Sequence, residues 1–313
     1  MLSGSVTSKQ SLTVWLLTDE KPGHRNQLLG LGERLQAVAG AQVELRSLQQ
    51  MPISISDWLL KRAPDTGEQT CPDWVVGAGH RTHRSVLFSR RLFNAKSIVL
   101  MKPTLPLGWF DACIIPHHDN PPQRESVLAT HGVLNTMTPR PHGRKADQGV
   151  ILIGGESAHF TWHSERVVQQ VTDICMAQPS LRWTLSTSRR TPDDFFPLLQ
   201  QRNLLNLTLM AADQTPPGWV REQLESAVQV WVTRDSVSMV FESITAAAPT
   251  GLLALPAAKS SRVVNSMKDV IKQGWAMDFE HWNTRLPLPD NKQTLWESDR
   301  AARWLLQRFG VSL

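Results

Sequence analysis

The chain has 313 residues, of which 41% are hydrophobic and 19% charged. This length predicts two domains with sizeable cores. No stretch reaches the roughly 18 consecutive apolar residues of a membrane-spanning helix, and the three widely spaced cysteines argue against a disulfide framework or a zinc knuckle. The first dozen residues lack the apolar core of a signal peptide, so we expect a cytoplasmic protein.

The net charge of +5 is distributed unevenly. Residues 1–145 contain 17 lysines and arginines against 11 acidic residues, whereas residues 146–313 contain 16 against 17. A basic first half is expected either to serve solubility or to face an anionic partner.

In the first half, apolar segments of strand length alternate with helical patterns. The predicted strands are Leu12–Leu17, Ala41–Leu48, Asp73–Val76, Lys96–Met101, Asp111–Ile115 and Val127–Thr130. The predicted helices are one with a stripe of Leu28, Leu31, Leu35 and Val38, a short one at Asp57–Arg62 and a basic one at Thr82–Phe93. The polar segment Pro139–Gln148 is the predicted linker.

The second half repeats this alternation. Its predicted strands are Val150–Ile153, Leu181–Ser186, Leu205–Met210, Val228–Val232 and Gly251–Leu255. Its predicted helices begin at Ser164, at the start signal Thr191-Pro192-Asp193-Asp194, at Ser236, at Arg262 and at the capping box that opens with Thr294.

Strands that alternate with helices twice over predict an α/β protein with two Rossmann-like, doubly wound domains facing each other across a cleft. We assign residues 1–140 to the first domain and 149–293 to the second. The helix within 294–313 is expected to pack back on the first domain. Ligands of such sheets bind at the carboxyl ends of the strands, where the strand-to-helix loops gather.

The most distinctive of these loops follows the apolar strand before Gly154 and Gly155. A strand, a glycine turn and a helix can present backbone N–H groups to a phosphate. An ordinary turn without a ligand is the alternative, because no G-x-G-x-x-G pattern is present.

Further polar residues lie in other predicted loops of the second half. Arg189 and Arg190 have side chains suited to bidentate phosphate binding, or are a solvated pair on a turn. Arg234, Asp235 and Ser236 join a strand to a helix, and the last two are also candidates for capping that helix. Glu242, inside the helix, is a candidate for binding a ribose diol.

Histidines do not form a convincing metal site. His80 and His83 follow a glycine, and His117 and His118 are adjacent and diverge on any regular element. No Asp-x-Asp pair is present to hold a divalent metal beside a diphosphate. We therefore predict no metal and no cofactor.

Six motifs, in order, carry a resemblance to a known family. They are WLLTDEKPGHRNQ, VVGAGHRTH, VLMKPTLP, FDACIIPHHD, LIGGESAHF and WVTRDSVSMVFE. From about Val14 to Gly274 the chain closely resembles the mitochondrial-fission "elongated mitochondria" family, which has many bacterial members, and it departs mildly at Glu20, Ala158 and Phe241.

The same series is similar to GT-B glycosyltransferases, especially the N-acetylglucosaminyltransferase that completes the lipid-linked peptidoglycan precursor. This resemblance implies a GT-B-like fold, a nucleotide-diphosphate sugar as donor and no bound metal. It places His24 toward the acceptor, Gly154, Gly155 and Ser157 at the donor, and Glu242 at the ribose. The acceptor-side loops would contribute Gly23, Gly77, Gly79 and His80.

The expected activity is inverting transfer of the sugar to an envelope glycan or lipid-linked acceptor. His24 or Asp19 would be the general base, and histidine is suited to that task near neutral pH. The alternatives are a nucleotide-sugar epimerase and a non-catalytic recruitment protein. Nucleic acid is not an expected partner.

Two segments of the basic half combine cations with large apolar side chains. They are Trp58–Arg62 and Lys102 with Leu105–Phe110. Such segments suit the interface of an anionic membrane, so we expect peripheral association with the inner face of a membrane.

Overall fold

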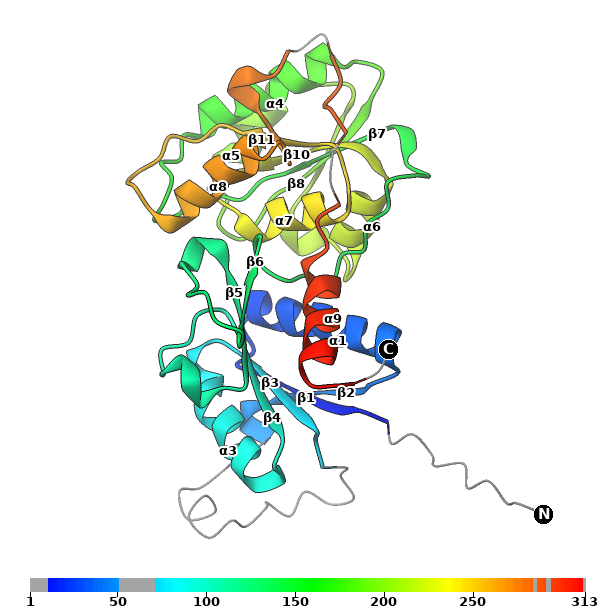
Figure 1. The fold of residues 1–313 in the computed structure, drawn as a ribbon. Coiled ribbons are helices and arrows are strands. Elements are labelled where there is room, and N and C mark those ends of the chain that lie inside the picture. Colours follow the sequence, from blue (N-terminus) through cyan, green and yellow to red (C-terminus); the bar gives the residue numbers. More distant parts are fainter. Residues whose placement is uncertain (1–10, 51–70, 284–285, 291–293, 312–313) are drawn as a thin grey trace, which may run out of the picture. The chain divides into compact units, whose positions relative to one another are not determined.

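The computed structural model describes residues 11–50, 71–283, 286–290 and 294–311 (Figure 1). These residues form two compact units. Unit 1 comprises Met1–Thr130, Leu134–Thr136 and Glu297–Leu313, and unit 2 comprises His131–Val133 and Met137–Trp296. The predicted helix Asp57–Arg62 and the apolar Trp58–Leu60 lie outside the described residues.

Unit 1 is built on a six-stranded parallel sheet with the strand order β2-β1-β3-β4-β5-β6. Its strands are β1 (Thr13–Thr18), β2 (Gln42–Ser47), β3 (Trp74–Ala78), β4 (Lys96–Leu100), β5 (Ala112–Pro116) and β6 (Val127–Thr130). Its helices are α1 (Pro22–Ala39), α3 (His83–Phe93) and α9 (Glu297–Arg308).

The sheet of unit 1 is buried on both faces, which explains why its strands are apolar without alternation. On β1, Val14 and Leu16 belong to one apolar cluster, and Trp15 and Leu17 belong to another. Residues of α1 and α9 complete the first cluster, whereas α3 contributes Val86 to the second. The helices therefore cover the sheet on both sides, as in a doubly wound fold.

Unit 2 repeats this design with the parallel strand order β12-β11-β10-β7-β8-β9. Its strands are β7 (Lys145–Leu152), β8 (Arg182–Ser186), β9 (Leu207–Met210), β10 (Ala227–Thr233), β11 (Thr250–Leu253) and β12 (Met277–Asp278). Its helices are α4 (Ser164–Ala177), α5 (Phe195–Gln200), α6 (Trp219–Ser226), α7 (Val237–Thr245) and α8 (Arg262–Lys272).

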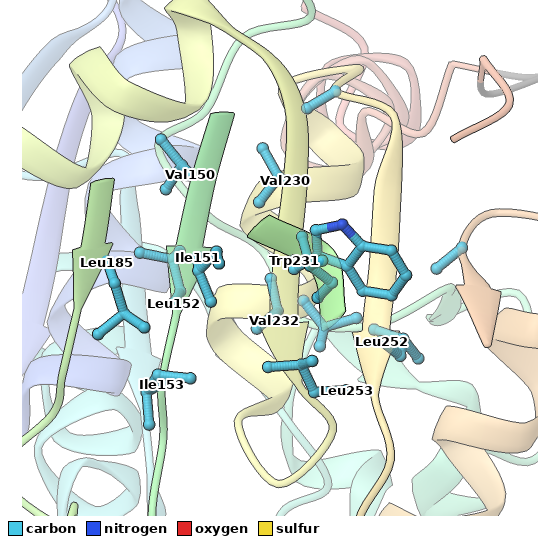
Figure 2. Packing of buried hydrophobic residues seen from close by; sticks show 14 of the residues in the cluster. Val150, Ile151, Leu152, Ile153, Leu185, Val230, Trp231, Val232, Leu252 and Leu253 are labelled. Carbon is cyan, nitrogen blue, oxygen red and sulfur yellow. The ribbon is translucent and has the colours of Figure 1, made fainter. Parts of the chain in front are cut away.

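The core of unit 2 is centred on its middle strands (Figure 2). Val150 to Ile153 and Val230 to Val232 are at most 1% exposed. Trp231 packs edge-on against Trp282, with ring centroids 4.9 Å apart. A Cβ on Gly251 of the neighbouring strand would come within 2.3 Å of the same indole, so the glycine makes room for it.

Some local predictions were wrong, and two elements were missed. The predicted linker Pro139–Gln148 overlaps β7, which begins at Lys145, because the polar residues 145–148 extend the strand before it becomes buried. The helix expected after Thr191 begins only at Phe195, since the Thr191 hydroxyl bonds to the carbonyl oxygen of Gly154. The short helix α6 and the two-residue strand β12 were not predicted.

Candidate functional site

The segment that follows β1 in unit 1 brings a histidine and an aspartate together. Asp19 follows β1, and His24 lies in the first turn of α1. His24 Nδ1 is 2.8 Å from Asp19 Oδ1, and the two side chains are 19% and 1% exposed, respectively. The imidazole therefore reaches solvent while the carboxylate is enclosed behind it. His24 does not cap α1, whose N-cap is Lys21.

Gly79, directly after the neighbouring strand β3, packs against this pair. A Cβ at this position would lie 2.4 Å from His24 Cε1 and 3.2 Å from Asp19 Oδ2. Gly79 also has a φ of 85° and a ψ of 154°, a conformation adopted essentially by glycine alone. The glycine thus allows the backbone to come into contact with the imidazole.

The pKa of Asp19 reflects two opposing effects. Burial raises the pKa, but the hydrogen bond from His24, the charge of His24 and the Lys21 backbone N–H together hold it below its ordinary value. Asp19 Oδ2 is buried and has no hydrogen-bond partner among the described residues. Asp19 is therefore an ionised, enclosed acceptor for His24 Nδ1 rather than a group open to solvent.

The other residues predicted for the acceptor side differ in their surroundings. Gly23 is in the first turn of α1, with open space where a Cβ would stand. Gly77 is buried in β3, where a Cβ would come within 2.4 Å of Thr82 Oγ1. His80 is exposed on the short helical turn after Gly79. Among the predicted glycines, Gly79 packs against the side chains of both His24 and Asp19.

In unit 2, the glycine loop after β7 is bound from within the protein. The Gly154 N–H donates to Thr233 Oγ1 at 2.7 Å, and the Gly155 N–H donates to Asp235 Oδ2 at 3.0 Å. The Glu156 N–H donates to the Arg190 carbonyl oxygen at 3.2 Å. The amides of Gly154 and Gly155, which were expected to point at a phosphate, are therefore occupied, and so is the amide of Glu156. The Ser157 hydroxyl accepts the N–H groups of His159 and Phe160 and closes the same turn.

Asp235 is the common partner in this region, and it does not cap α7 as the sequence suggested. Its side chain is fully buried, and Oδ2 lies 2.8 Å from Nη2 of Arg190 as well as accepting the Gly155 N–H. A Cβ on Gly154 would come within 2.3 Å of the same oxygen. The loops after β7, β8 and β10 are thus joined by one carboxylate.

Arg234 is likewise occupied. Its Nη2 lies 2.6 Å from Asp278 Oδ1 on β12, and the two side chains are 15% and 9% exposed. Ser236 is the N-cap residue of α7, but its side chain makes no capping hydrogen bond. Glu242 is half-buried on α7.

Arg189 differs from these two arginines. It is exposed and has no ion pair or hydrogen-bond partner for its guanidinium among the described residues. It lines a pocket of 390 Å³ together with Thr187, Ser188, Ala211 and Ala212. This pocket lies beyond the carboxyl ends of β8 and β9. Of the two predicted phosphate-binding arginines, Arg190 is engaged by Asp235 and the Glu156 carbonyl oxygen, whereas the guanidinium of Arg189 has no partner among the described residues.

Two further sequence predictions concern a metal site and a segment that inserts into a membrane. Among the described residues, no three histidine, cysteine or acidic side chains are grouped closely enough to hold a metal ion. Phe110, expected to insert into a membrane, is 3% exposed and packs against His83, whereas Trp109 is 51% exposed. No helix in the described part of the chain is long and apolar enough to cross a membrane.

The sequence missed three contacts that build these sites. Asp278 was not singled out as the partner of Arg234, Thr233 was not linked to Gly154, and Gly79 was not placed against His24. Each contact joins residues that are at least 44 positions apart. The available signal was that Gly154 and Thr233 directly follow predicted strands, whereas Asp278 lies on β12, which was not predicted.

Comparisons with known proteins extend over nearly the whole chain. The sequence model of a family described as mitochondrial fission ELM1 matches residues 22–309. The uncharacterized protein RP120 of Rickettsia prowazekii is 22% identical over 334 aligned positions, which cover 88% of this chain and 92% of that protein.

Solved structures with the same fold include two sugar-nucleotide epimerases. A Listeria monocytogenes protein named as a UDP-N-acetylglucosamine 2-epimerase gives a TM-score of 0.60 at 10% identity, covering 97% of this chain and 98% of that one. The Neisseria meningitidis UDP-GlcNAc 2-epimerase, solved with UDP-GlcNAc, gives 0.52 at 8% identity, with coverages of 96% and 100%. These likenesses concern the fold, and they confirm the predicted GT-B-like class with two Rossmann-like domains.

Proposed function

Since this chain belongs to the mitochondrial fission ELM1 family and has a GT-B fold, we propose that it binds a nucleoside-diphosphate sugar and transfers the sugar to an acceptor hydroxyl. The observation that carries the proposal is the His24–Asp19 pair. A general base needs a second group that fixes its tautomer and orientation, and Asp19 supplies one by accepting from Nδ1. Nε2 then keeps the lone pair that takes up a proton.

The proposed reaction is a single displacement. Nε2 of His24 takes the proton of the acceptor hydroxyl as its oxygen attacks the anomeric carbon of the sugar. The bond from that carbon to the diphosphate breaks, the diphosphate leaves with the electron pair, and the anomeric configuration inverts. Asp19 stays paired with the imidazolium that forms, since its Oδ1 lies 2.8 Å from Nδ1. In this assignment Asp19 orients the base and is not the base itself.

On the donor side, the structure changes which residues support phosphate binding. The amides of Gly154 and Gly155 and the side chains of Arg190 and Arg234 have internal partners, so they act by shaping the loop. We assign the diphosphate to Arg189. The leaving group would then be stabilised by a guanidinium without a metal ion.

The acceptor is proposed to be an anionic or lipid-linked glycan. Support comes from the first half of the chain, with 17 basic against 11 acidic residues. A cationic surface raises the local concentration of an anionic substrate.

Titration of the protein with nucleoside diphosphates and nucleotide sugars tests the proposal, with heat of binding and product analysis as the two readouts. We expect binding without added metal and unchanged binding in the presence of a chelator. Transfer requires both donor and acceptor. If the donor alone is converted into an epimer, the activity is epimerisation and not transfer. Binding without any product would indicate a recruitment protein.

The two neighbouring arginines form a matched pair for this test. Arg189→Gln should weaken diphosphate binding about tenfold or more, because a charge-assisted bond to phosphate is lost, and should leave the melting temperature unchanged. Arg190→Gln should lower the melting temperature, because Arg190 holds Asp235 and the carbonyl oxygen of Glu156. Equal diphosphate affinity in Arg189→Gln and wild type would remove Arg189 from the site.

His24→Gln separates binding from chemistry. We expect normal diphosphate affinity and a turnover reduced about 100-fold or more, the usual contribution of a general base. A normal turnover in this variant would assign the base elsewhere.

A further inference from the structure

A polar pocket in unit 1 lies at the amino ends of the strands, the opposite end of the sheet from the His24–Asp19 pair. It has a volume of 540 Å³ and is lined by Arg90, Arg91, Lys96, Trp109 and Asp111. Lys96 is the first residue of β4, and Asp111 immediately precedes β5. Asp19 and Gly79 instead follow the carboxyl ends of β1 and β3. The pocket is therefore separate from the proposed catalytic residues.

Asp111, the one acidic residue that lines the pocket, already has hydrogen-bond partners within the protein. Asp111 Oδ2 accepts the N–H and the hydroxyl of Ser97, both at 2.8 Å, and Oδ1 lies 3.0 Å from Nη2 of Arg90. The three cations exceed the single carboxylate, so the pocket carries a positive charge. No described carboxylate forms an ion pair with Lys96.

Arg90 is held in place before any ligand arrives. Its Nη1 donates to the Trp109 carbonyl oxygen at 2.8 Å, and its Nη2 donates to Asp111. A guanidinium has five N–H donors, so three remain for another acceptor. Its side chain is 43% exposed. A fixed, partly exposed guanidinium gives up little conformational entropy when it binds an oxyanion.

Arg90 and Arg91 have a simpler explanation when considered alone. They lie in the last turn of α3, where the helix dipole favours cations. That explanation does not account for Lys96, which comes from β4, or for Trp109, whose indole is 51% exposed. Cations from two elements around one cavity, with a half-exposed aromatic ring at its edge, are the composition of a site for a phosphate attached to an apolar or planar group.

We propose that this pocket, formed by Arg90, Arg91, Lys96 and Trp109, binds a phosphate group. The phosphate is that of a lipid headgroup or of a soluble phosphorylated molecule. Arg91 and Lys96 supply charge, Arg90 supplies oriented donors, and Trp109 contacts the group that carries the phosphate. The proposal is independent of the transfer reaction, because it uses neither His24 nor Arg189.

Binding to vesicles and binding to inorganic phosphate distinguish the two sources. The first probe is a vesicle that contains phosphatidylglycerol, compared with a vesicle of phosphatidylcholine alone. The second probe is inorganic phosphate, whose binding is measured by calorimetry. The variants are Arg91→Gln combined with Lys96→Gln, and Trp109→Ala. The matched control is Arg84→Gln, which removes an exposed arginine of the same helix that does not line the pocket.

We expect the double variant to lose about tenfold or more in affinity for one of the two probes, while Arg84→Gln and the melting temperatures stay near wild type. Trp109→Ala should reduce vesicle binding and spare inorganic phosphate if the source is a lipid. The same loss of affinity per removed charge in Arg84→Gln and in the double variant would reduce the effect to diffuse surface charge and overturn the proposal. Absence of binding to both probes at low salt, where surface charges are least screened, would overturn it as well.

Discussion

A carboxylate with a depressed pKa makes stability depend on pH. The folded pKa of Asp19 lies below its ordinary value, so the ionised form binds better to its surroundings in the folded state than in the unfolded state. This contribution is fully present above the ordinary pKa of an aspartate and is lost as the pH falls through the lowered value.

The Asp19→Asn variant tests this dependence. We expect a smaller free energy of unfolding than wild type at neutral pH, and a difference that shrinks below about pH 4 as the wild-type carboxylate becomes protonated. Urea denaturation of both proteins over that range measures it. The exposed Asp213→Asn is the control. A difference that stays constant down to the acid limit would show that the charge of Asp19 does not stabilise the fold.

Gly79 and Gly23 offer a matched pair of substitutions near the same histidine. Gly79→Ala should destabilise unit 1 by about 1–3 kcal/mol, because of its backbone conformation and because the new Cβ would overlap His24. Gly23→Ala, in the first turn of α1 with open space around it, should be neutral or stabilise by up to about 1 kcal/mol. Thermal unfolding gives both values, and tolerance of Gly79→Ala would contradict the close packing.

At the scale of elements, three strand-to-helix loops of unit 2 depend on one another. The loops after β7, β8 and β10 meet at the fully buried carboxylate of Asp235, which binds the Gly155 N–H and Arg190. A loop fixed in this way keeps its shape without a ligand, which reduces the entropy lost on binding.

Asp235→Asn should therefore affect both stability and donor binding. We expect unit 2 to lose about 1–3 kcal/mol, since an amide replaces an ionised acceptor of two bonds, and diphosphate affinity to fall although Asp235 does not contact the ligand in our proposal. Calorimetry on the variant and on the exposed Asp269→Asn of α8, which does not line the Arg189 pocket, measures both effects. A stable Asp235→Asn with unchanged affinity would show that the loops are held by other contacts.

Elements were easier to predict than their connections. Helix α8 begins and ends where the sequence placed it, because apolar positions recur at helical spacing and Gly274 follows. The start signal at Thr191 failed because its hydroxyl serves the Gly154 loop rather than the helix. Candidate site residues were found where they follow strands. The residues with which they pair could not be predicted. Pairs such as Arg190–Asp235 and Arg234–Asp278 join segments that are distant in sequence, so no local sequence pattern indicates them.

At the scale of the whole molecule, unit 1 is discontinuous in sequence. Helix α9 packs against α1, where Arg34 and Asp299 form an ion pair of 2.5 Å. Ala301, Ala302, Leu305 and Leu306 are fully buried in the core of unit 1. Ser298 Oγ donates to the Asn135 carbonyl oxygen at 2.6 Å and accepts the Asn135 N–H. Unit 1 therefore requires the last helix of this sequence.

Leu305→Ala tests this requirement. It should destabilise unit 1 by about 2–5 kcal/mol, as is usual for the loss of a buried leucine, and leave unit 2 unaffected. Hydrogen exchange followed by fragment mass should show lost protection in β1 and α1 but not in β7 or β10. The exposed Gln307→Ala is the control. Equal loss of protection in both units would mean that they unfold as one.

The order of synthesis has a consequence for folding that follows from α9. Domains generally fold in the order in which a ribosome makes them, with the N-terminal one first. Here the strands of unit 1 emerge early but lack one of the two helices that cover one face of their sheet, and that helix, α9, is translated after all of unit 2. A nascent chain would thus complete its second unit first. Until α9 has been translated, the apolar cluster that Leu28, Leu31 and Leu35 of α1 share with α9 is incomplete, so part of this apolar surface stays exposed during synthesis.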